Sequence, residues 1–308
     1  SWAVALGERL AAASQKAETI PLPTTLAGAT VKIRDSAGVE RPAPLLYASP
    51  GQINFLVPAR TAPGTARIVF SGADGATVVD SVEIERVAPA LFTANASGEG
   101  VAAAHLTRVR PDGSQSVEDI FRYDAAQKKM IATPLEFGPE SEQLVLTLFG
   151  TGIRGRSDLS AVRVNIDTDE AQVLYAGPQG VFDGLDQVNL LLPRSIIGFG
   201  EVDLKLTVDG KNANPVKLNL GGIPVPRVTL LRPFGAAAGQ TLAEFLIIGR
   251  FLSGATAVEV SPPEGITVSG LQTTPTSAKG QLAVADGAQP GRRMLSVVSA
   301  GGHSAPLP

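Results

Sequence analysis

The sequence has 308 residues, of which 44% are hydrophobic and only 5% aromatic, with a formal net charge of −3 at pH 7. It contains no cysteine, which excludes thiolate catalysis, cysteine-ligated zinc and disulfide bonds. It also has no Lys/Arg-rich run and no apolar run of the ~20 residues that a membrane span needs, so it lacks the marks of a nucleic-acid-binding or membrane-spanning protein.

The N-terminal part is expected to form short strands. The first predicted strand is Trp2–Leu6, and a distinctive stretch, Tyr47–Pro58, follows after several turn residues. Strand-like runs at Ala62–Phe70 and Val82–Ile84 come next. Short strands with Gly and Pro between them are typical of an immunoglobulin-like β sandwich, to which we assign residues 1–95.

Between this sandwich and the next lies extra material that predicts a β meander. Its three strand-like runs are Val101–Arg108, Ser116–Tyr123 and Met130–Phe137, separated by a Pro-Asp-Gly turn and a polar turn. We expect the meander to pack on the second sandwich, and we assign the meander and that sandwich together to residues 96–221.

The second sandwich repeats the distinctive stretch of the first. Tyr175–Pro178 and Gln187–Pro193 match Tyr47–Pro58 around a short insertion. The run Glu201–Val208 alternates polar and apolar residues, which predicts a half-buried strand, and an Asp-Gly hairpin turn follows it.

A fainter third copy occupies residues 222–308. It has an opening strand at Phe245–Gly249, further runs at Gln281–Val284 and Met294–Val298, and a closing Gly-Gly turn. The sequence therefore predicts an all-β fold of three tandem immunoglobulin-like β sandwiches, with the meander inserted between the first and the second.

Long phrases of the chain resemble a known family. Over about residues 20–220 it resembles the β-rich C-terminal modules of secreted acidobacterial proteins, and its C-terminal part resembles the TIG/IPT type of immunoglobulin-like domain. The resemblance implies export and a sandwich fold, and it brings no catalytic motif to carry over. The matching phrases are Pro21–Ile33, Ala43–Pro58, Val145–Val162 and Val173–Pro193 for the modules, and Gly249–Val258 and Ala288–Val298 for the TIG/IPT domain.

One motif suggests nucleotide binding. Gly150–Gly155 is a literal G-x-G-x-x-G after a predicted strand, with acids at Asp167 and Asp169 beyond it. A dinucleotide site needs a helix whose N-terminus faces the pyrophosphate, and the six residues before the strand Val162–Ile166 are too few for one. We interpret the glycines as an architectural turn and expect no nucleotide and no other cofactor.

The remaining titratable residues form no recognisable site. His105 and His303 are the two histidines, and we interpret them as unrelated, so neither a catalytic residue nor a metal ligand is assigned. Acidic residues in two predicted loops leave calcium binding as an alternative, although acidic side chains in turns are more often simply solvated. These acids are Asp167, Asp169, Asp183 and Asp186.

A Gln-x-Asn pair occurs at the same place in both full copies, as Gln52 and Asn54 and as Gln187 and Asn189. On an alternating strand these amides face away from the apolar residues between them. We favour a structural role, such as side-chain bonds to the backbone of a neighbouring loop, over ligand binding.

These observations favour a non-enzymatic structural or adhesive protein of the cell surface. The chain starts at Ser1 and not at Met, so we expect a processed or excised piece of an exported protein. Its expected partners are copies of itself or other cell-surface proteins. The alternative is an accessory module of a larger secreted protein, binding polysaccharide or protein.

One version of this hypothesis is assembly into a filament or sheath. We expect the last sandwich to have a shortened final strand, which would leave an open sheet edge for a strand of another copy. The predicted assembly strand carries Trp2, Val4 and Leu6 as its alternate side chains.

Overall fold

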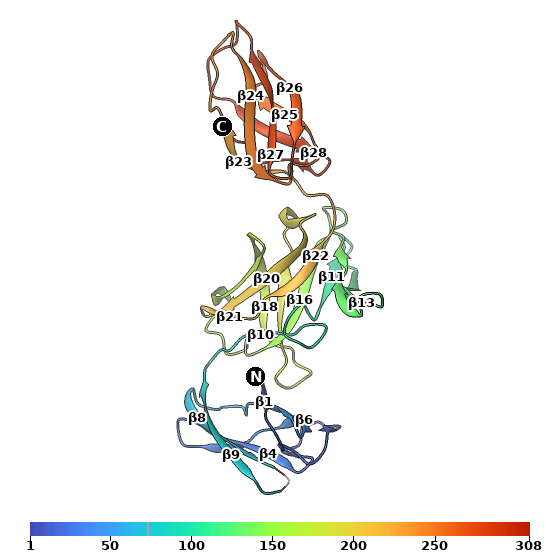
Figure 1. Cartoon of the computed structure of the whole chain (residues 1–308), viewed down its shortest axis with the longest axis vertical. Helices are drawn as coiled ribbons and strands as arrows, with labels where there is room; N and C mark the ends of the chain where they lie inside the picture. Colours follow the sequence, from blue (N-terminus) through green and yellow to red (C-terminus); the bar gives the residue numbers. More distant parts are fainter. Residues whose placement is uncertain (73) are drawn as a thin grey trace. The chain divides into compact units, whose positions relative to one another are not determined.

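The computed structural model describes residues 1–72 and 74–308 and confirms the all-β fold (Figure 1). The described residues contain no α-helix, and so none that could cross a membrane. Two 3₁₀ turns, η1 (Leu159–Ala161) and η2 (Arg194–Ile196), are the only helical elements among them. The chain divides into two compact units, and the division into three domains stays a prediction. The first unit comprises Ser1–Thr133, Glu140–Pro193 and Val202–Leu218, and the second Pro134–Pro139, Arg194–Glu201 and Asn219–Pro308.

The N-terminal strands form two sheets. One sheet has the order β1 (Trp2–Leu6), β7 (Gln52–Leu56), β6 (Leu45–Ser49) and β2 (Gln15–Lys16). The other has the order β3 (Thr25–Leu26), β4 (Ala29–Arg34), β8 (Gly64–Ser71) and β9 (Thr77–Ile84), with β5 (Glu40–Pro42) paired to β4.

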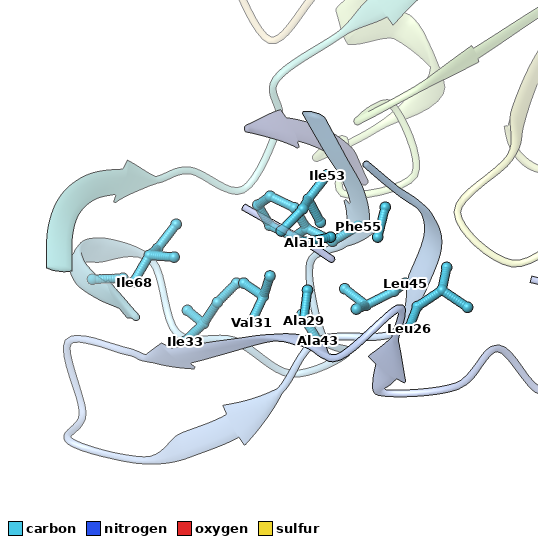
Figure 2. Packing of buried hydrophobic residues seen from close by; sticks show 12 residues of the cluster. Ala11, Leu26, Ala29, Val31, Ile33, Ala43, Leu45, Ile53, Phe55 and Ile68 are labelled. Carbon is cyan, nitrogen blue, oxygen red and sulfur yellow. The ribbon is translucent and has the colours of Figure 1, made fainter. Parts of the chain in front are cut away.

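The two sheets enclose an apolar core (Figure 2). Val31 and Ile33 alternate inward on β4, and Ile53 and Phe55 do so on β7. Full burial of each such side chain stabilises the fold by about 1.5–3 kcal/mol. Because inward and outward positions alternate, Gln52 and Asn54 lie on the outer face, as the pattern predicts.

The middle of the chain forms one eleven-stranded sheet. Its main path is β12 (Gln115–Asp119), β11 (Ala104–Val109), β16 (Gln143–Thr151), β19 (Asp186–Leu191), β18 (Asp169–Pro178), β17 (Val162–Ile166), β20 (Gly200–Val208), β22 (Val216–Leu220) and β15 (Pro134–Leu135). Two short strands join it from the side, β10 (Ala90–Leu91) on β16 and β21 (Lys211–Asn212) on β20. On β20, Leu204, Leu206 and Val208 are buried, so the predicted alternation is confirmed there.

The C-terminal strands again form two sheets. One has the order β23 (Arg227–Arg232), β24 (Thr241–Arg250), β27 (Ser277–Val284) and β26 (Ile266–Thr273). The other has the order β25 (Ala255–Ser261), β28 (Met294–Ser299) and β29 (Gly302–His303). Their core contains Phe245, Ile247 and Val297. The order of an opening strand followed by a hairpin occurs three times in the chain, as β1-β7-β6, β16-β19-β18 and β24-β27-β26.

The predicted meander differs in detail. The run expected as one strand, Ser116–Tyr123, is interrupted at Ile120, which turns into the core and is buried. As a result β12 pairs with β11, while β13 (Phe121–Asp124) pairs with β14 (Lys129–Ala132) in a separate sheet. The insertion is therefore two hairpins, and β11 of the first is a full neighbour of β16.

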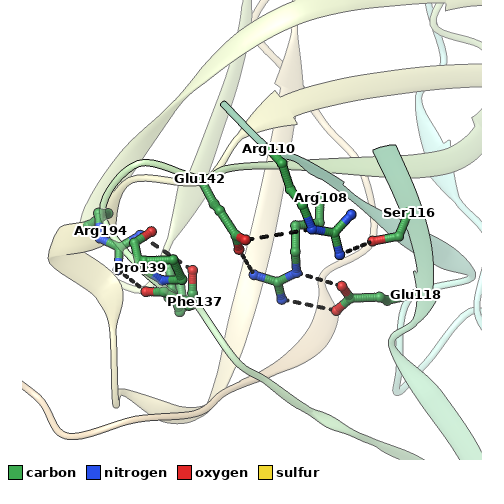
Figure 3. Close-up of polar contacts among 9 residues, drawn as sticks. Arg108, Arg110, Ser116, Glu118, Phe137, Pro139, Glu142 and Arg194 are labelled. Atoms are coloured by element: carbon green, nitrogen blue, oxygen red, sulfur yellow. Dashed lines mark hydrogen bonds and ion pairs between the residues drawn. The ribbon is translucent and has the colours of Figure 1, made fainter. Parts of the chain in front are cut away.

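A buried arginine stands at the inner face of β11 (Figure 3). The Arg108 guanidinium donates to Glu118 through Nε at 2.6 Å and to Glu142 through NH1 at 2.8 Å. Hydrogen bonds to Glu118, which has the larger effect, and to Glu142 raise the pKa of Arg108 above its ordinary value. The side chain therefore keeps its charge despite burial. Figure 3 also shows Arg194 donating to the backbone carbonyls of Phe137 and Pro139.

The loop after β4 is organised around one carboxylate. Asp35 is buried and accepts hydrogen bonds from the backbone amides of Ala62 (3.1 Å) and Val39 (3.0 Å) and from the Arg41 guanidinium (2.5 Å). The Ala62 amide is the largest influence, and together these donors lower the pKa of Asp35 from 3.8 to about 2.

This arrangement predicts acid sensitivity. Because folding lowers the pKa of Asp35, its contribution to stability is fully present above about pH 4 and is lost as pH falls towards about 2. We expect the stability difference between the wild type and Asp35→Asn to shrink over this range. Urea denaturation of both proteins at pH 6, 4 and 2.5 measures this. A difference that does not change with pH would show that Asp35 is not ionised in the way its contacts require.

Candidate functional site

The repeated stretch forms the same irregular hairpin twice. In β6–β7 a β-bulge lies between Leu45 and Tyr47, and Tyr47 is then opposite Asn54. In β18–β19 the bulge lies between Val173 and Tyr175, and Tyr175 is opposite Asn189. A bulge adds one residue on one strand and re-aims the side chains after it. Both copies thereby bring the tyrosine to the outer face, beside the Gln-x-Asn pair.

Within each pair the two amides bond to each other. Gln52 Nε2 donates to Asn54 Oδ1 at 2.6 Å, and Gln187 Nε2 donates to Asn189 Oδ1 at 3.3 Å. The described residues show no bond from these four side chains to a loop backbone, which was the contact that we expected. The structural role of the pairs stays a prediction. One acceptor, Gln Oε1, and one donor group, Asn Nδ2, remain available on each half-buried pair.

In the second copy aromatic rings flank the amides. The register places Phe149 of β16 opposite Gln187, and the His105 ring of β11 lies 5.4 Å from the Phe149 ring. On the other side Tyr175 is 36% exposed, and its hydroxyl donates to the carbonyl of Pro178 at 2.7 Å. We call these residues on one outer sheet face the amide–ring strip. Its members are His105, Phe149, Tyr175, Gln187 and Asn189.

Only part of this strip was foreseen from the sequence. The repeat identified the two amides and the tyrosine, but we interpreted His105 as an isolated residue. Phe149 and His105 join the strip because β11 and β16 are neighbours, and the order of strands in a sheet is not written in the local sequence. The signal available in the sequence was the position of Phe149 on its strand. It is one residue away from the inward-facing Leu148, so it faces the opposite side of the sheet from Leu146 and Leu148.

In the first copy β1 takes the place that β16, with Phe149, has in the second copy. Val4 is opposite Asn54 and Leu6 is opposite Gln52, and their exposed fractions are 57% and 78%. Trp2 instead contacts its own chain, since a Cβ on Gly184 would stand 3.0 Å from the indole nitrogen. The predicted assembly strand is thus already paired with β7 along its length. It lies at the edge of the described sheet, where the Trp2 amide donates to Thr151 Oγ1 at 2.9 Å.

The open edge expected in the C-terminal sandwich does not occur along β28. Residues 302–307 return beside this strand: β29 pairs with it, Ser304 N donates to the Val297 carbonyl at 2.8 Å, and Leu307 and Leu295 exchange two backbone bonds. A segment that contains a proline, Pro306, still satisfies this edge, because its donors fall at Ser304 and Leu307. An incoming strand would have to displace it.

The glycine fingerprint serves backbone packing. A Cβ would stand 2.3 Å from the Ala90 carbonyl oxygen at Gly150, 1.9 Å from that of Ala88 at Gly152, and 2.0 Å from that of Arg86 at Gly155. All three distances are far below any van der Waals contact. The segment 86–90, which leads into β10, can lie against the turn only because these positions lack a side chain.

The amides of this turn already have an anionic partner. The buried Asp186 carboxylate accepts hydrogen bonds from the backbone of Ile153 (2.8 Å) and Arg154 (3.1 Å) and from the Arg154 Nε (2.6 Å). In a dinucleotide site such amides would face a phosphate. The element that follows is the short turn η1, which agrees with the interpretation of the motif as architectural.

The other candidate residues remain separate. His303 lies 3.4 Å from Glu259, and both are exposed. Asp183 is exposed, Asp186 is committed to Arg154, and Asp169 accepts from Thr168. Among the residues that the structure describes, no three His, Asp or Glu side chains gather as a metal site.

No family model and no curated protein matches the chain. Solved structures with some similarity include the Bacteroides ovatus mixed-linkage glucan utilization locus protein SGBP-B in complex with a heptasaccharide, at 15% identity and a TM-score of 0.21 over 96% of this chain and 59% of that one. The I9–I11 tandem of titin has 8% identity and a TM-score of 0.20 over 98% and 97% of the two chains. The eight N-terminal immunoglobulin domains of DSCAM have 10% identity and a TM-score of 0.21 over 90% and 43%.

At these values the similarities carry no argument about this chain. Its all-β fold rests on its own strands, and it spans less than two thirds of the SGBP-B and DSCAM chains. The resemblance to acidobacterial modules and to TIG/IPT domains stays a prediction.

The packing of the glycine turn can be tested with a matched pair of variants. Gly152 and Gly113 both have positive φ, +72° and +83°, but a Cβ on Gly113 meets nothing within 4 Å. We expect Gly152→Ala to lower the free energy of unfolding by about 1–3 kcal/mol more than Gly113→Ala, because only the former overpacks a backbone contact. Chemical denaturation measures both. Equal losses would mean that the turn tolerates a side chain and that the packing explanation is wrong.

Proposed function

We propose that this chain is a non-catalytic, extracellular β-sandwich module that binds another molecule through the amide–ring strip. The observation that carries the proposal is that the second copy of a duplicated hairpin holds an amide pair between aromatic rings on an outer sheet face. The first copy holds the same pair between Tyr47 and the aliphatic side chains of β1. A purely structural pair has no need of this difference in its surroundings.

The chemistry of the strip suits a neutral, polyhydroxylated ligand such as a glycan chain. Gln187 Oε1 can accept from a hydroxyl, and Asn189 Nδ2 can donate to one. The faces of Phe149 and Tyr175 can cover the apolar C–H face of a sugar ring. No member of the strip carries a full charge when His105 is neutral, which disfavours nucleic acids and acidic peptides. An open sheet face also accommodates an extended chain better than a small compact ligand.

The non-catalytic part of the proposal rests on how the polar groups are used. The buried Asp186 is held by Arg154 and two backbone amides, so it is not poised to exchange protons with a substrate. His105 lies against a phenylalanine ring, where it supplies a surface. General acid–base or nucleophilic catalysis needs such groups to face a reacting atom together.

The test is calorimetric titration of the whole chain with soluble neutral oligosaccharides: cello-, xylo-, manno- and mixed-linkage gluco-hexaoses. We expect at least one to bind, and Asn189→Ala and Tyr175→Ala each to weaken that binding by about tenfold, the effect of losing one good polar or stacking contact. The matched control is Asn54→Ala, which should leave binding unchanged. Absence of binding across the panel, or equal effects of Asn54→Ala and Asn189→Ala, would contradict the proposal.

The second candidate function is self-association, which the exposure of Val4 and Leu6 on the edge strand β1 favours. An edge strand with apolar side chains invites pairing with a second copy. Because β1 is paired with β7, the association would add edge to edge, without removing β1 from its own sheet. Pairing of β1 with β1 of a second copy closes as a dimer, whereas pairing of β1 with a different edge of the second copy is head-to-tail and can extend into a filament.

Sedimentation velocity over a hundredfold range of concentration tests this candidate. We expect larger species to appear as concentration rises and to disappear in the double variant Val4→Lys and Leu6→Lys, because charges on an edge strand oppose pairing. Ile20→Lys is the control, since Ile20 is 77% exposed and outside any strand. A wild type that stays monomeric throughout removes the candidate.

A further inference from the structure

A cavity of about 420 Å³ lies in the C-terminal sandwich, between its two sheets. Leu242 and Phe245 of β24 and Leu282 of β27 line one side, and Val260 of β25 and Leu295 of β28 line the other. Its volume falls within the range of small-molecule sites, about 300–1,000 Å³. The lining is mainly apolar and belongs to the core of the sandwich.

The mouth of the cavity is a loop of small residues. Residues 233–238 are exposed and line the opening, and among them Phe234 has an exposed fraction of 77%. The alanines at 236–238 leave room for a ligand to enter. A phenylalanine left in solvent beside an apolar cavity has a ready partner in the apolar part of such a ligand.

Arg293 supplies the polar end of the cavity. Its Nε–H is buried and has no hydrogen-bond partner among the described residues, while NH2 donates to the Gln289 carbonyl at 3.0 Å. Gly291 leaves room for the guanidinium, since a Cβ there would stand 3.2 Å from NH1. The Nε atom has no accessible surface, so a ligand in the cavity can reach the guanidinium only through its terminal nitrogens.

The charged side chains among the described lining residues are positive. Arg292 and Arg293 both line the cavity, and none of the described lining residues is Asp or Glu. An arginine in a protein remains protonated, so an anion in the cavity would meet a permanent positive charge. The planar guanidinium matches a carboxylate, which accepts from its two terminal nitrogens together.

We propose that this cavity is a binding site for a small amphipathic carboxylate, with an apolar body between the two sheets and its carboxylate on Arg293. The site is independent of the amide–ring strip and involves different residues. Medium-chain fatty acids and aryl-alkanoic acids belong to this chemical class. The apolar lining selects the body, and the charged guanidinium selects a carboxylate head over an alcohol.

The experiment uses decanoate as the probe and decanol as its uncharged counterpart, with binding to the whole chain followed by calorimetry below the micelle concentration. We expect decanoate to bind more than tenfold more tightly than decanol, because a hydrogen bond to a charged group adds more than a neutral one. Arg293→Gln should remove this preference and leave decanol affinity unchanged. Lys279→Gln is the charge-matched control, since Lys279 lies on β27 outside the lining.

A second variant keeps the proposal testable if Arg293→Gln disturbs folding. Ala237→Trp places a large ring in the exposed mouth, outside the packed core, and should abolish binding of both probes. Three outcomes would overturn the proposal: no saturable binding of decanoate, equal affinity for the acid and the alcohol, or binding that persists in Ala237→Trp.

Discussion

The constraint on which both proposed sites depend is the direct packing of a strand end against a backbone carbonyl. At Gly150 on β16 the neighbour is the carbonyl of Ala90, and at Gly249 on β24 it is the carbonyl of Arg227, 2.0 Å from where a Cβ would be. No other residue fits at such distances. The first contact fixes the strand that carries Phe149 into the amide–ring strip. The second fixes the strand that carries Phe245 into the wall of the cavity.

The duplicated hairpin shows how one scaffold can carry two surfaces. The bulge, the tyrosine opposite asparagine and the Gln–Asn bond are the same in both copies, because they are properties of two adjacent strands. The third strand differs. β1 contributes Val4 and Leu6 to the first copy, whereas β16 contributes Phe149 to the second. The pairing of the two hairpin strands is therefore the same in both copies. The third strand, which lies beside the hairpin, determines which side chains the outer face presents.

The sequence predicted what depends on local pattern and missed what depends on strand order. Alternation at Leu204, Leu206 and Val208 was enough to place a core strand, and the repeat was enough to place Gln187 and Asn189 on an outer face. The partnership of His105 with Phe149 depends on β11 joining the large sheet, a pairing across more than thirty residues. The unpaired Nε–H of Arg293 could not be predicted from the sequence for the same reason, because the burial of a single atom depends on how the whole sandwich packs. Ile120 shows that local pattern can also fail. Its side chain turns into the core and divides a predicted strand, although no Gly or Pro in the sequence indicates a break there.

The Asp186 carboxylate occupies the backbone amides of the glycine turn. It sits on the backbone amides of Ile153 and Arg154 and on the Arg154 side chain, as an external anion would. Because it is tethered to the same folded sheet, its effective concentration at the turn far exceeds that of any free phosphate. The amides that would face a phosphate in a dinucleotide site are thus occupied in this protein by a carboxylate of the chain itself.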